Sequence, residues 1–377
     1  MKSCVATLIS TIATVSLLAE EAAAVEHPQL LSTADFVPTW EDRPKKDDLV
    51  VEAREQARTK KLDHGLRPVI GVLTEPIRGD LYKAATARDE PATKVESDGE
   101  RTASYIPRTH VQFLEQAGVR VVPIDHRLPA EEIRALLDQV NGLYMPGDSQ
   151  LAITDEVYKY AFMVATTHVE QLNWEADEHF PLFMMGNALS TYVRSKQTHR
   201  GVLTDMEAQR HSNSRIDLLK HPDDTFFFNK MGREEKQAMF NTAQFFNMQV
   251  TGLRPVDLER EDLLASHIVP IATFTSHAIA EPNEQFIAIA EGAKMPWYAF
   301  TYAVEMVQFY FEDPSATLDS FQLDHSIIAR KHAQTVASLI ADECRLNDHS
   351  FDSQEQVFEN LVRHEELVSV TYETENS

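Results

Sequence analysis

Short apolar runs alternate with segments of helical period from residue 67 onward. Val69–Leu73, Arg120–Ile124 and Gly142–Met145 each have the length and composition of a short buried strand. Between them, residues 106–117 and 129–140 carry apolar positions at helical spacing. Strands that alternate with helices in this way predict an α/β sheet with helices on both faces.

The second half of the chain continues this pattern. His179–Met184 predicts another strand, which enters a turn at Gly186 and then a helix. After a long middle stretch, the apolar runs 285–290 and 297–300 are joined through Glu291-Gly292, which indicates a hairpin. A last helix with one apolar face is expected over His325–Cys344.

The remaining segments define the expected domain limits. Residues 25–66 mix charges and prolines, so we interpret them as an N-terminal extension. The α/β domain is expected over residues 67–347, with residues 75–103 as an irregular loop. The acidic residues 348–377 are interpreted as a C-terminal tail with room for one more helix. The aromatic stretch Phe226-Phe227-Phe228 is expected in the core, as a buried strand, rather than in an exposed contact patch.

Residues 1–24 have the features of a secretory signal peptide. Met1-Lys2 is a positive n-region, Val5–Ala19 is mostly apolar, and Ala22-Ala23-Ala24 offers a small-residue cleavage site. The apolar run is too short to span a bilayer, which needs about 20 residues. A mitochondrial transit peptide is the alternative, but it expects several Arg and few acids, whereas this segment has no Arg and contains Glu20-Glu21. We therefore expect the secretory pathway, with a secreted protein or one in the vacuolar or lysosomal lumen, and no membrane insertion after cleavage.

Composition narrows the classes of partner. The formal net charge of −24 argues against nucleic acids and anionic membranes, which attract Lys and Arg. Cys4 would leave with the signal, and Cys344 alone cannot form an internal disulfide. The chain has no GxGxxG after a strand, no GxxxxGK[ST], no HExxH and no CxxC, so we expect no cofactor and no metal.

Several strings together resemble one known family, the γ-glutamyl hydrolases. Their order and spacing, rather than any one string, carry the resemblance, which extends from residue 67 to about residue 350. The strings are Arg67–Leu73, Leu114–Pro123, Asn141–Gly147, Phe180–Phe183, Ile289–Tyr298 and Ala337–Glu343. The resemblance implies a three-layer α/β sandwich with a central, mostly parallel sheet, of the class I glutamine-amidotransferase-like type with a flavodoxin-like core. It also implies cleavage of γ-linked glutamates from folate polyglutamates by a Cys nucleophile, a His and a nearby Glu.

The family's nucleophile is missing from its place. In the family, a Cys follows the Phe-Pro strand on a sharp strand-to-helix turn, an elbow whose backbone N–H groups hold the oxyanion. This chain reads Met184-Met185-Gly186-Asn187-Ala188, so Gly186 stands at the Cys position. Glycine tolerates the strained backbone of an elbow at little cost, so the turn can persist without the chemistry. Ser190, the nearest hydroxyl, is expected to point elsewhere, and Cys344 is expected to be structural.

Other positions of the family site differ as well. The family pattern Tyr-Pro-x-Tyr-Gly-x-Gln-Trp-His-Pro-Glu aligns with Met295–Glu305, so the His becomes Ala303 and only Glu305 remains. The oxyanion loop Pro-Gly-Gly-Ser becomes a loop containing Gly147 and Asp148, whose carboxylate would oppose a developing negative charge. A substrate-contacting His of the family aligns with Asn241.

These differences predict a degenerate member without catalytic residues, in which Gly186, Ala303, Glu305, Gly147, Asp148 and Asn241 are vestigial site positions. Its function is expected to be the binding of an unknown protein partner or assembly, with a homodimer as one option. Two alternatives remain open: a γ-glutamyl hydrolase that works by an unrecognised route, and a carrier of a small ligand in the emptied pocket. If Met184 and Met185 fill the space above Gly186, the non-catalytic interpretation is favoured.

Overall fold

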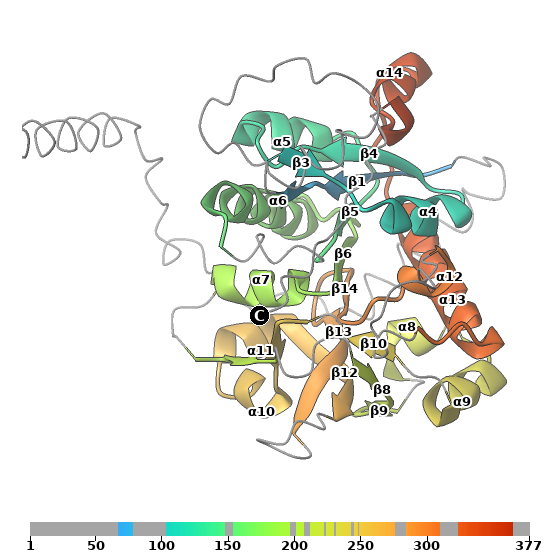
Figure 1. Ribbon diagram of the computed structural model, residues 1–377. Helices are drawn as coiled ribbons and strands as arrows, with labels where there is room; N and C mark the ends of the chain where they lie inside the picture. The colour runs from blue at the N-terminus through green and yellow to red at the C-terminus, as the bar shows by residue number, and fades with distance from the viewer. Residues whose placement is uncertain are drawn as a thin grey trace, which may run out of the picture. The chain divides into compact units, whose positions relative to one another are not determined.

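An eight-stranded sheet organises the part of the chain that the computed structural model describes (Figure 1). The described residues are 67–77, 103–147, 154–196, 201–206, 212–221, 224–229, 231–242, 245–247, 249–275, 284–309 and 323–364. The expected signal peptide and N-terminal extension, and the position of Asp148, lie outside these residues. None of the described helices is long and apolar enough to cross a membrane.

The main sheet contains five parallel strands followed by three antiparallel ones. Its order is β4 (Arg120–Ile124), β1 (Val69–Leu73), β5 (Leu143–Met145), β6 (Leu182–Met185), β14 (Trp297–Phe300), β13 (Gln285–Gly292), β12 (Ile268–Thr275) and β9 (Ile216–Leu218). Neighbouring strands from β4 to β14 pair in parallel, and the pairs from β14 to β9 are antiparallel. Counted along the chain, the parallel strands have the order 2-1-3-4-5 of flavodoxin-like folds. The expected fold class is confirmed.

Three short ladders and a set of helices complete the described fold. The ladders pair β2 (Glu75–Ile77) with β3 (Ala103–Tyr105), β7 (Leu203–Asp205) with β11 (Thr251–Leu253), and β8 (Ser212–Ser214) with β10 (Phe245–Asn247). The helices are α4 (Arg108–Gln116), α5 (Ala130–Leu137), α6 (Glu156–Trp174), α7 (Ala188–Lys196), α8 (Phe226–Asn229), α9 (Arg233–Thr242), α10 (Pro255–Leu258), α11 (Asp262–His267), α12 (Met306–Phe309), α13 (Ile327–Cys344) and α14 (Gln354–Glu359), with a 3-10 turn at Val362–His364.

Two cores lie on opposite faces of the sheet, because side chains alternate along each strand. Val69 and Leu73 of β1 join the core with α5, α6 and α7, whereas Ile70 and Val72 join the core with α4 and α13. Figure 1 shows these helices on either side of the parallel strands. Burial on both faces explains why each parallel strand is a continuous apolar run in the sequence.

Side-chain caps fix where two long helices begin. Asp155 accepts a hydrogen bond from the N–H of Tyr158 at the start of α6, and Ser326 accepts one from Ala329 at the start of α13. Such caps satisfy N–H groups that have no partner inside the helix. The two helices pack into the cores on opposite faces of the sheet, α6 into one and α13 into the other.

Some expected elements differ in detail. The aromatic stretch 226–228 is buried at Phe227 and Phe228, as expected, but it forms the short helix α8 and not a strand. The expected loop 75–103 begins with β2, which pairs with β3 at its far end. The segment assigned to the tail contains α14, as expected, and its Gln354 accepts a hydrogen bond of 2.9 Å from Arg120 of β4. The tail segment up to residue 364 is therefore packed onto the domain.

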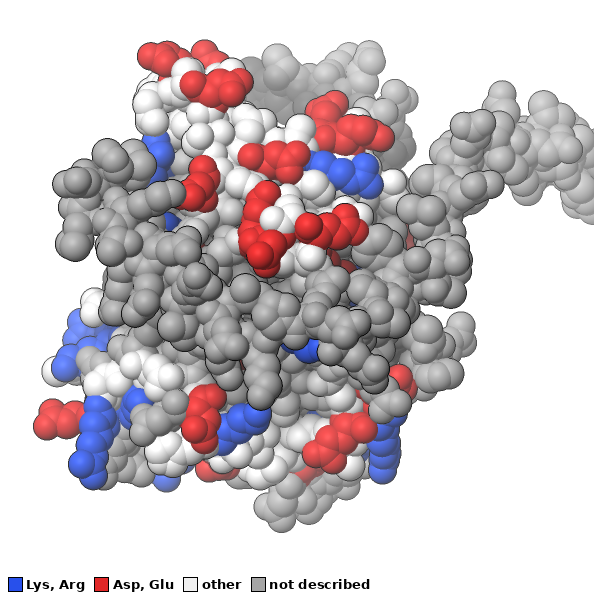
Figure 2. All heavy atoms as spheres, turned by 180° about the vertical axis from the view of Figure 1, so that it is seen from behind, with Lys and Arg blue, Asp and Glu red and all other residues white. Residues whose placement is uncertain are grey.

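The charge of the chain is visible on its surface. Figure 2 shows Asp and Glu side chains gathered over the upper part of the face seen from behind, with most Lys and Arg lower on that face. A surface of this kind repels polyanions and favours solubility.

Candidate functional site

Three of the expected site positions follow neighbouring parallel strands at one edge of the sheet. Since β5, β6 and β14 run parallel, their carboxyl ends lie at the same edge, where open α/β sheets bind ligands. Gly147 follows β5, Gly186 follows β6 and Ala303 follows β14. The three strands that precede these positions are thus neighbours in the sheet.

Gly186 occupies a sharp turn between β6 and α7. Its φ is +48°, in the left-handed region that L residues with side chains adopt only with strain. Its N–H donates a hydrogen bond of 2.9 Å to the carbonyl of Phe300, which fixes the turn to the end of β14. The geometry is that of an elbow, and a glycine stands at its apex.

The backbone of Gly147 lies directly against this turn. The carbonyl oxygen of Gly147 accepts two hydrogen bonds from Asn187, one from the backbone N–H at 3.0 Å and one from Nδ2 at 2.8 Å. A Cβ added to Gly186 would lie 2.9 Å from that oxygen and 3.2 Å from its carbon. The space in which a nucleophilic side chain would begin is thus filled by main-chain atoms.

Asn187 is the link that holds the two loops together. Its side chain is buried, and its Oδ1 accepts a hydrogen bond of 2.9 Å from the N–H of Val250. In nucleophile elbows, the N–H of the residue after the nucleophile helps to hold the oxyanion. Here that N–H already bonds to the carbonyl of Gly147. An internal carbonyl therefore occupies the donor that a substrate carbonyl would need.

The paired methionines do not lie together above Gly186. Met184 and Met185 are both fully buried in β6, but they point to opposite faces of the sheet, Met184 into the core with α6 and Met185 into the core with α4. Strand alternation forces this separation. The condition stated above, that they fill the space above Gly186, is therefore not met, because the Gly147 backbone lies there instead.

Ala303 and Glu305 lie in a buried segment after β14. The N–H of Ala303 donates a hydrogen bond of 3.0 Å to the carbonyl of Phe246 in β10. Its methyl group joins a small apolar cluster with Phe246, Met306 and Leu323. Glu305 is 1% exposed, so it is a buried carboxyl group and not a solvated one. Apolar side chains surround the position where the family has its general base.

The other expected positions are placed less directly. Asn241 lies in α9, and its side chain is outside the described residues. The middle segment that reaches Ala303 is β10, through Phe246 and the bridge between Asn247 and Tyr302. The sequence pattern alone did not single out β10, whose contacts are long-range.

The candidate nucleophiles outside the elbow are engaged elsewhere. Ser190 is 1% exposed, and its hydroxyl donates to the carbonyl of Thr251 at 2.7 Å. Cys344 is fully buried in α13, next to Gly142 at the start of β5. Both observations agree with the structural roles expected for these residues. Among the described residues there is also no group of His, Cys, Asp and Glu able to hold a metal ion.

A buried tyrosine–histidine pair lies beside Ala303 and was not anticipated. The Tyr302 hydroxyl and Nε2 of His332 are 2.5 Å apart, and the rings of Phe227 and Phe245 pack edge-on against the imidazole. Burial lowers the pKa of His332 to about 3 and raises the pKa of Tyr302 well above its ordinary value. Both groups are therefore neutral near pH 7, and neither is open to a substrate. The pair ties α13 to the end of β14.

Together these features define a class of protein: an α/β fold with a flavodoxin-like sheet and an elbow turn whose apex carries no side chain. Sequence comparison makes the class more specific. The chain is 25% identical to gamma-glutamyl hydrolase B of Dictyostelium discoideum, over 78% of this chain and 77% of the relative. It is 24% identical to gamma-glutamyl hydrolase 1 of Arabidopsis thaliana over the same shares, and 22% identical to the gamma-glutamyl hydrolase of Homo sapiens over 80% and 85%.

The chain is similar in sequence to γ-glutamyl hydrolases over about four fifths of its length. No family model matches it. Among solved structures, a putative GMP synthase component from Thermoplasma acidophilum aligns with 74% of this chain and 96% of its own, at 10% identity and a TM-score of 0.41.

Proposed function

We propose that this protein is a γ-glutamyl-hydrolase-like pseudoenzyme that keeps the family fold to bind a protein partner or to assemble, without hydrolysing γ-glutamyl bonds. The observation that carries the proposal is the contact between Gly147 and the elbow. Gly186 has no side chain, and the carbonyl of Gly147 fills the space beside it. The same carbonyl oxygen accepts the hydrogen bond of the Asn187 N–H.

The chemistry of acyl transfer indicates how large the loss of hydrolysis rate should be. Acyl transfer of this kind needs a nucleophile, a base that activates it and N–H donors for the oxyanion. Removal of a nucleophile and its base costs about a million-fold in rate in serine hydrolases. At the aligned positions this chain has Gly186 and Ala303, and the oxyanion donor is already engaged. The expected rate is then close to that of the uncatalysed reaction.

A second candidate is a divergent hydrolase that cuts folate polyglutamate or γ-glutamyl peptides by another route. It is favoured by the names of relatives that match about four fifths of the chain at 20–25% identity, which are gamma-glutamyl hydrolases. Such an enzyme would need a nucleophile from elsewhere, because Ser190 and Cys344 are buried and engaged in the fold.

The proposal also specifies a cellular compartment and a class of partner. The signal-like residues 1–24 favour the lumen of the secretory pathway, either secreted or vacuolar or lysosomal. The acidic surface favours a partner that is a protein and not a nucleic acid or an anionic membrane. A second copy of the chain is the simplest such partner.

The test combines turnover, binding and assembly in one preparation of the mature chain. Methotrexate diglutamate is incubated with the chain and, in parallel, with the human relative as positive control. Calorimetric titration with the same compound and sedimentation at several protein concentrations follow. We expect no turnover above buffer. Turnover that is lost when one residue near Gly186 is mutated would establish the divergent hydrolase, whereas tight binding without turnover would favour a ligand carrier.

A further inference from the structure

A buried hydroxyl group joins three segments at the carboxyl ends of β1 and β4. Thr74 follows β1, and its Oγ1 accepts a hydrogen bond of 3.0 Å from the backbone N–H of His126, in the turn after β4. The same oxygen accepts a hydrogen bond of 2.5 Å from the hydroxyl of Ser104 in β3 and lies 3.0 Å from Nδ1 of His126. We call these three contacts the Thr74 latch, because they tie the β2–β3 ladder and the turn after β4 to the end of β1.

The imidazole of His126 is buried, and its two nitrogens have different surroundings. The side chain is 0% exposed, and the ring packs edge-to-face against Tyr158 in the first turn of α6, with 5.8 Å between the ring centres. Nδ1 contacts the Thr74 hydroxyl, whereas Nε2 has no hydrogen-bond partner among the residues that the structure describes. One ring nitrogen therefore belongs to the latch and the other faces no polar group of the described chain.

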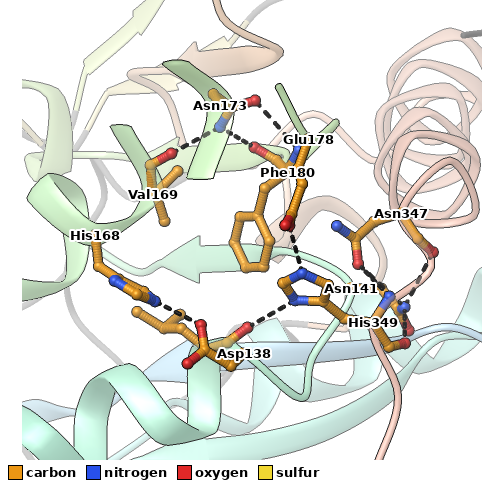
Figure 3. A network of polar contacts seen from close by, with 10 residues as sticks. Asp138, Asn141, His168, Val169, Asn173, Glu178, Phe180, Asn347 and His349 are labelled. Carbon is orange, nitrogen blue, oxygen red and sulfur yellow. Dashed lines mark hydrogen bonds and ion pairs between the residues drawn. The ribbon is translucent and has the colours of Figure 1, made fainter. Parts of the chain in front are cut away.

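The histidines drawn in Figure 3 differ from His126 at this nitrogen. Nε2 of His168 lies 2.7 Å from Oδ1 of Asp138. Nε2 of His349 lies 2.6 Å from Oε2 of Glu178. In both rings a hydrogen on Nε2 has an acceptor, which a hydrogen on Nε2 of His126 lacks among the described residues.

These contacts favour a neutral His126 ring. The hydroxyls of Thr74 and Ser104 can each donate or accept, so they satisfy Nδ1 whether or not it carries the hydrogen. A protonated ring carries a hydrogen on both nitrogens, and the charged N–H at Nε2 would then be buried without an acceptor. Burial accordingly lowers the pKa of His126, although the negative charges of Asp125 and Asp155 act in the opposite direction.

We propose that the Thr74 latch is an acid-sensitive device, which holds the β2–β3 ladder and the turn after β4 on the domain while the His126 ring is neutral. Protonation of the ring favours the open state, in which Nε2 reaches water, so the two segments are released more readily at acid pH. The device involves neither the elbow nor a partner, so it is independent of the function proposed above. Histidine is suited to this role because its charge changes between pH 5 and 8.

The charged groups that act on the ring come from two elements. The turn after β4 contributes Asp125, whose Oδ1 is 3.9 Å from Nδ1 of His126, and Arg127, whose Nε donates to that carboxylate at 2.9 Å. Asp155, the N-cap of α6, is the third charge, and α6 also places Tyr158 against the ring. Burial opposes ionisation of Asp125, but hydrogen bonds from Arg127 hold its pKa below the usual value. The Asp125 charge is therefore constant in the pH range in which His126 titrates.

The sign of the pH dependence follows from proton counting. In the open state the imidazole reaches water and titrates near pH 6.5, whereas the pKa of the docked ring is lower. Below pH 6.5 the open state therefore binds more protons than the docked state. The latch is fully present above this pH. The opening equilibrium rises by up to about tenfold for each unit by which the pH is lowered, until the docked ring also takes up a proton.

The experiment is hydrogen–deuterium exchange of the full mature chain between pH 5 and 8, corrected for intrinsic exchange, in peptides covering residues 73–77, 103–106 and 124–128. His126→Asn is the informative variant, because its amide can donate to or accept from the Thr74 hydroxyl in place of Nδ1 and does not titrate. We expect opening to increase as the pH falls in the wild type and to be independent of pH in His126→Asn. His168→Asn, the matched control, should retain the wild-type dependence.

Three results would overturn the proposal. The first is opening that does not depend on pH in the wild type, and the second is a pH dependence that persists in His126→Asn. The third is parallel loss of protection in α13, which would show that the whole domain opens and not the latch. If His126→Asn fails to fold, nitrogen-15 spectra of the wild-type imidazoles decide instead. The His126 ring must be neutral at pH 5.5, where a free imidazole is mostly protonated, and a protonated signature there would contradict the latch.

Discussion

The elbow makes a quantitative prediction about stability through Gly186→Ala. At φ +48° an alanine pays about 1–2 kcal/mol for the left-handed backbone. Its Cβ also meets the Gly147 carbonyl oxygen at 2.9 Å, a main-chain atom that cannot rotate away, and such overpacking costs about 1–3 kcal/mol. Alanine also restricts the unfolded chain more than glycine does, which stabilises the folded state by about 0.4–1 kcal/mol. We expect the free energy of unfolding to fall by about 1–3 kcal/mol, because relaxation of the loop absorbs part of the clash.

Gly118→Ala separates backbone strain from steric contact. Gly118 also has a positive φ, +83°, but a Cβ there would meet nothing within 4 Å. Urea denaturation of both variants beside the wild type, followed by Trp fluorescence, gives the two losses. We expect Gly186→Ala to lower the free energy of unfolding more than Gly118→Ala does, by about 1 kcal/mol. Equal losses would show that Gly147 does not press on the elbow, and a neutral Gly186→Ala would refute the alignment that removes the nucleophile.

Three further predictions concern the same region. Restoring Gly186→Cys and Ala303→His together should leave γ-glutamyl hydrolysis at the level of a buffer control, because the Gly147 carbonyl still holds the oxyanion donor; hydrolysis at a rate typical of ordinary enzymes would contradict this. Asn187→Ala should lower the free energy of unfolding by about 1–3 kcal/mol, since it removes the buried side chain that joins the Gly147 carbonyl to the part-buried N–H of Val250; an unchanged urea midpoint would count against that link. Burial lowers the pKa of His332 to about 3, so between pH 6.5 and pH 3 only the unfolded imidazole takes up a proton, and the free energy of unfolding should fall by about 1.4 kcal/mol for each unit by which the pH is lowered. His332→Phe should flatten this slope, and an unchanged slope would refute the assignment.

The sequence was sufficient for the parallel half of the fold. Runs such as Val69–Leu73 and Leu143–Met145 are buried on both faces, so they appear in the sequence as continuous apolar segments. Glycine at 186 correctly predicted a turn, which the positive φ confirms. These features depend on local pattern, and local pattern is what a single sequence displays.

The rest depends on contacts between distant segments. No pattern near Gly147 reveals that its carbonyl meets Asn187, forty residues away, and the two loops meet only because β5 and β6 pair in parallel. Strand alternation places Met184 and Met185 on opposite faces of the sheet, so they cannot fill the site together. The pair of Tyr302 and His332 was missed because the buried histidine belongs to a helix remote in sequence.

The central claim is that the family fold persists here without the family chemistry, and a single-turnover measurement tests it most directly. Mature wild-type chain in excess is mixed with methotrexate diglutamate, and mass spectrometry follows released glutamate from acid to neutral pH. Our account predicts no product beyond a buffer control, even when every substrate molecule faces an excess of protein. One equivalent of glutamate, released at a rate that depends on protein concentration and disappears with a point mutation in the chain, would contradict it.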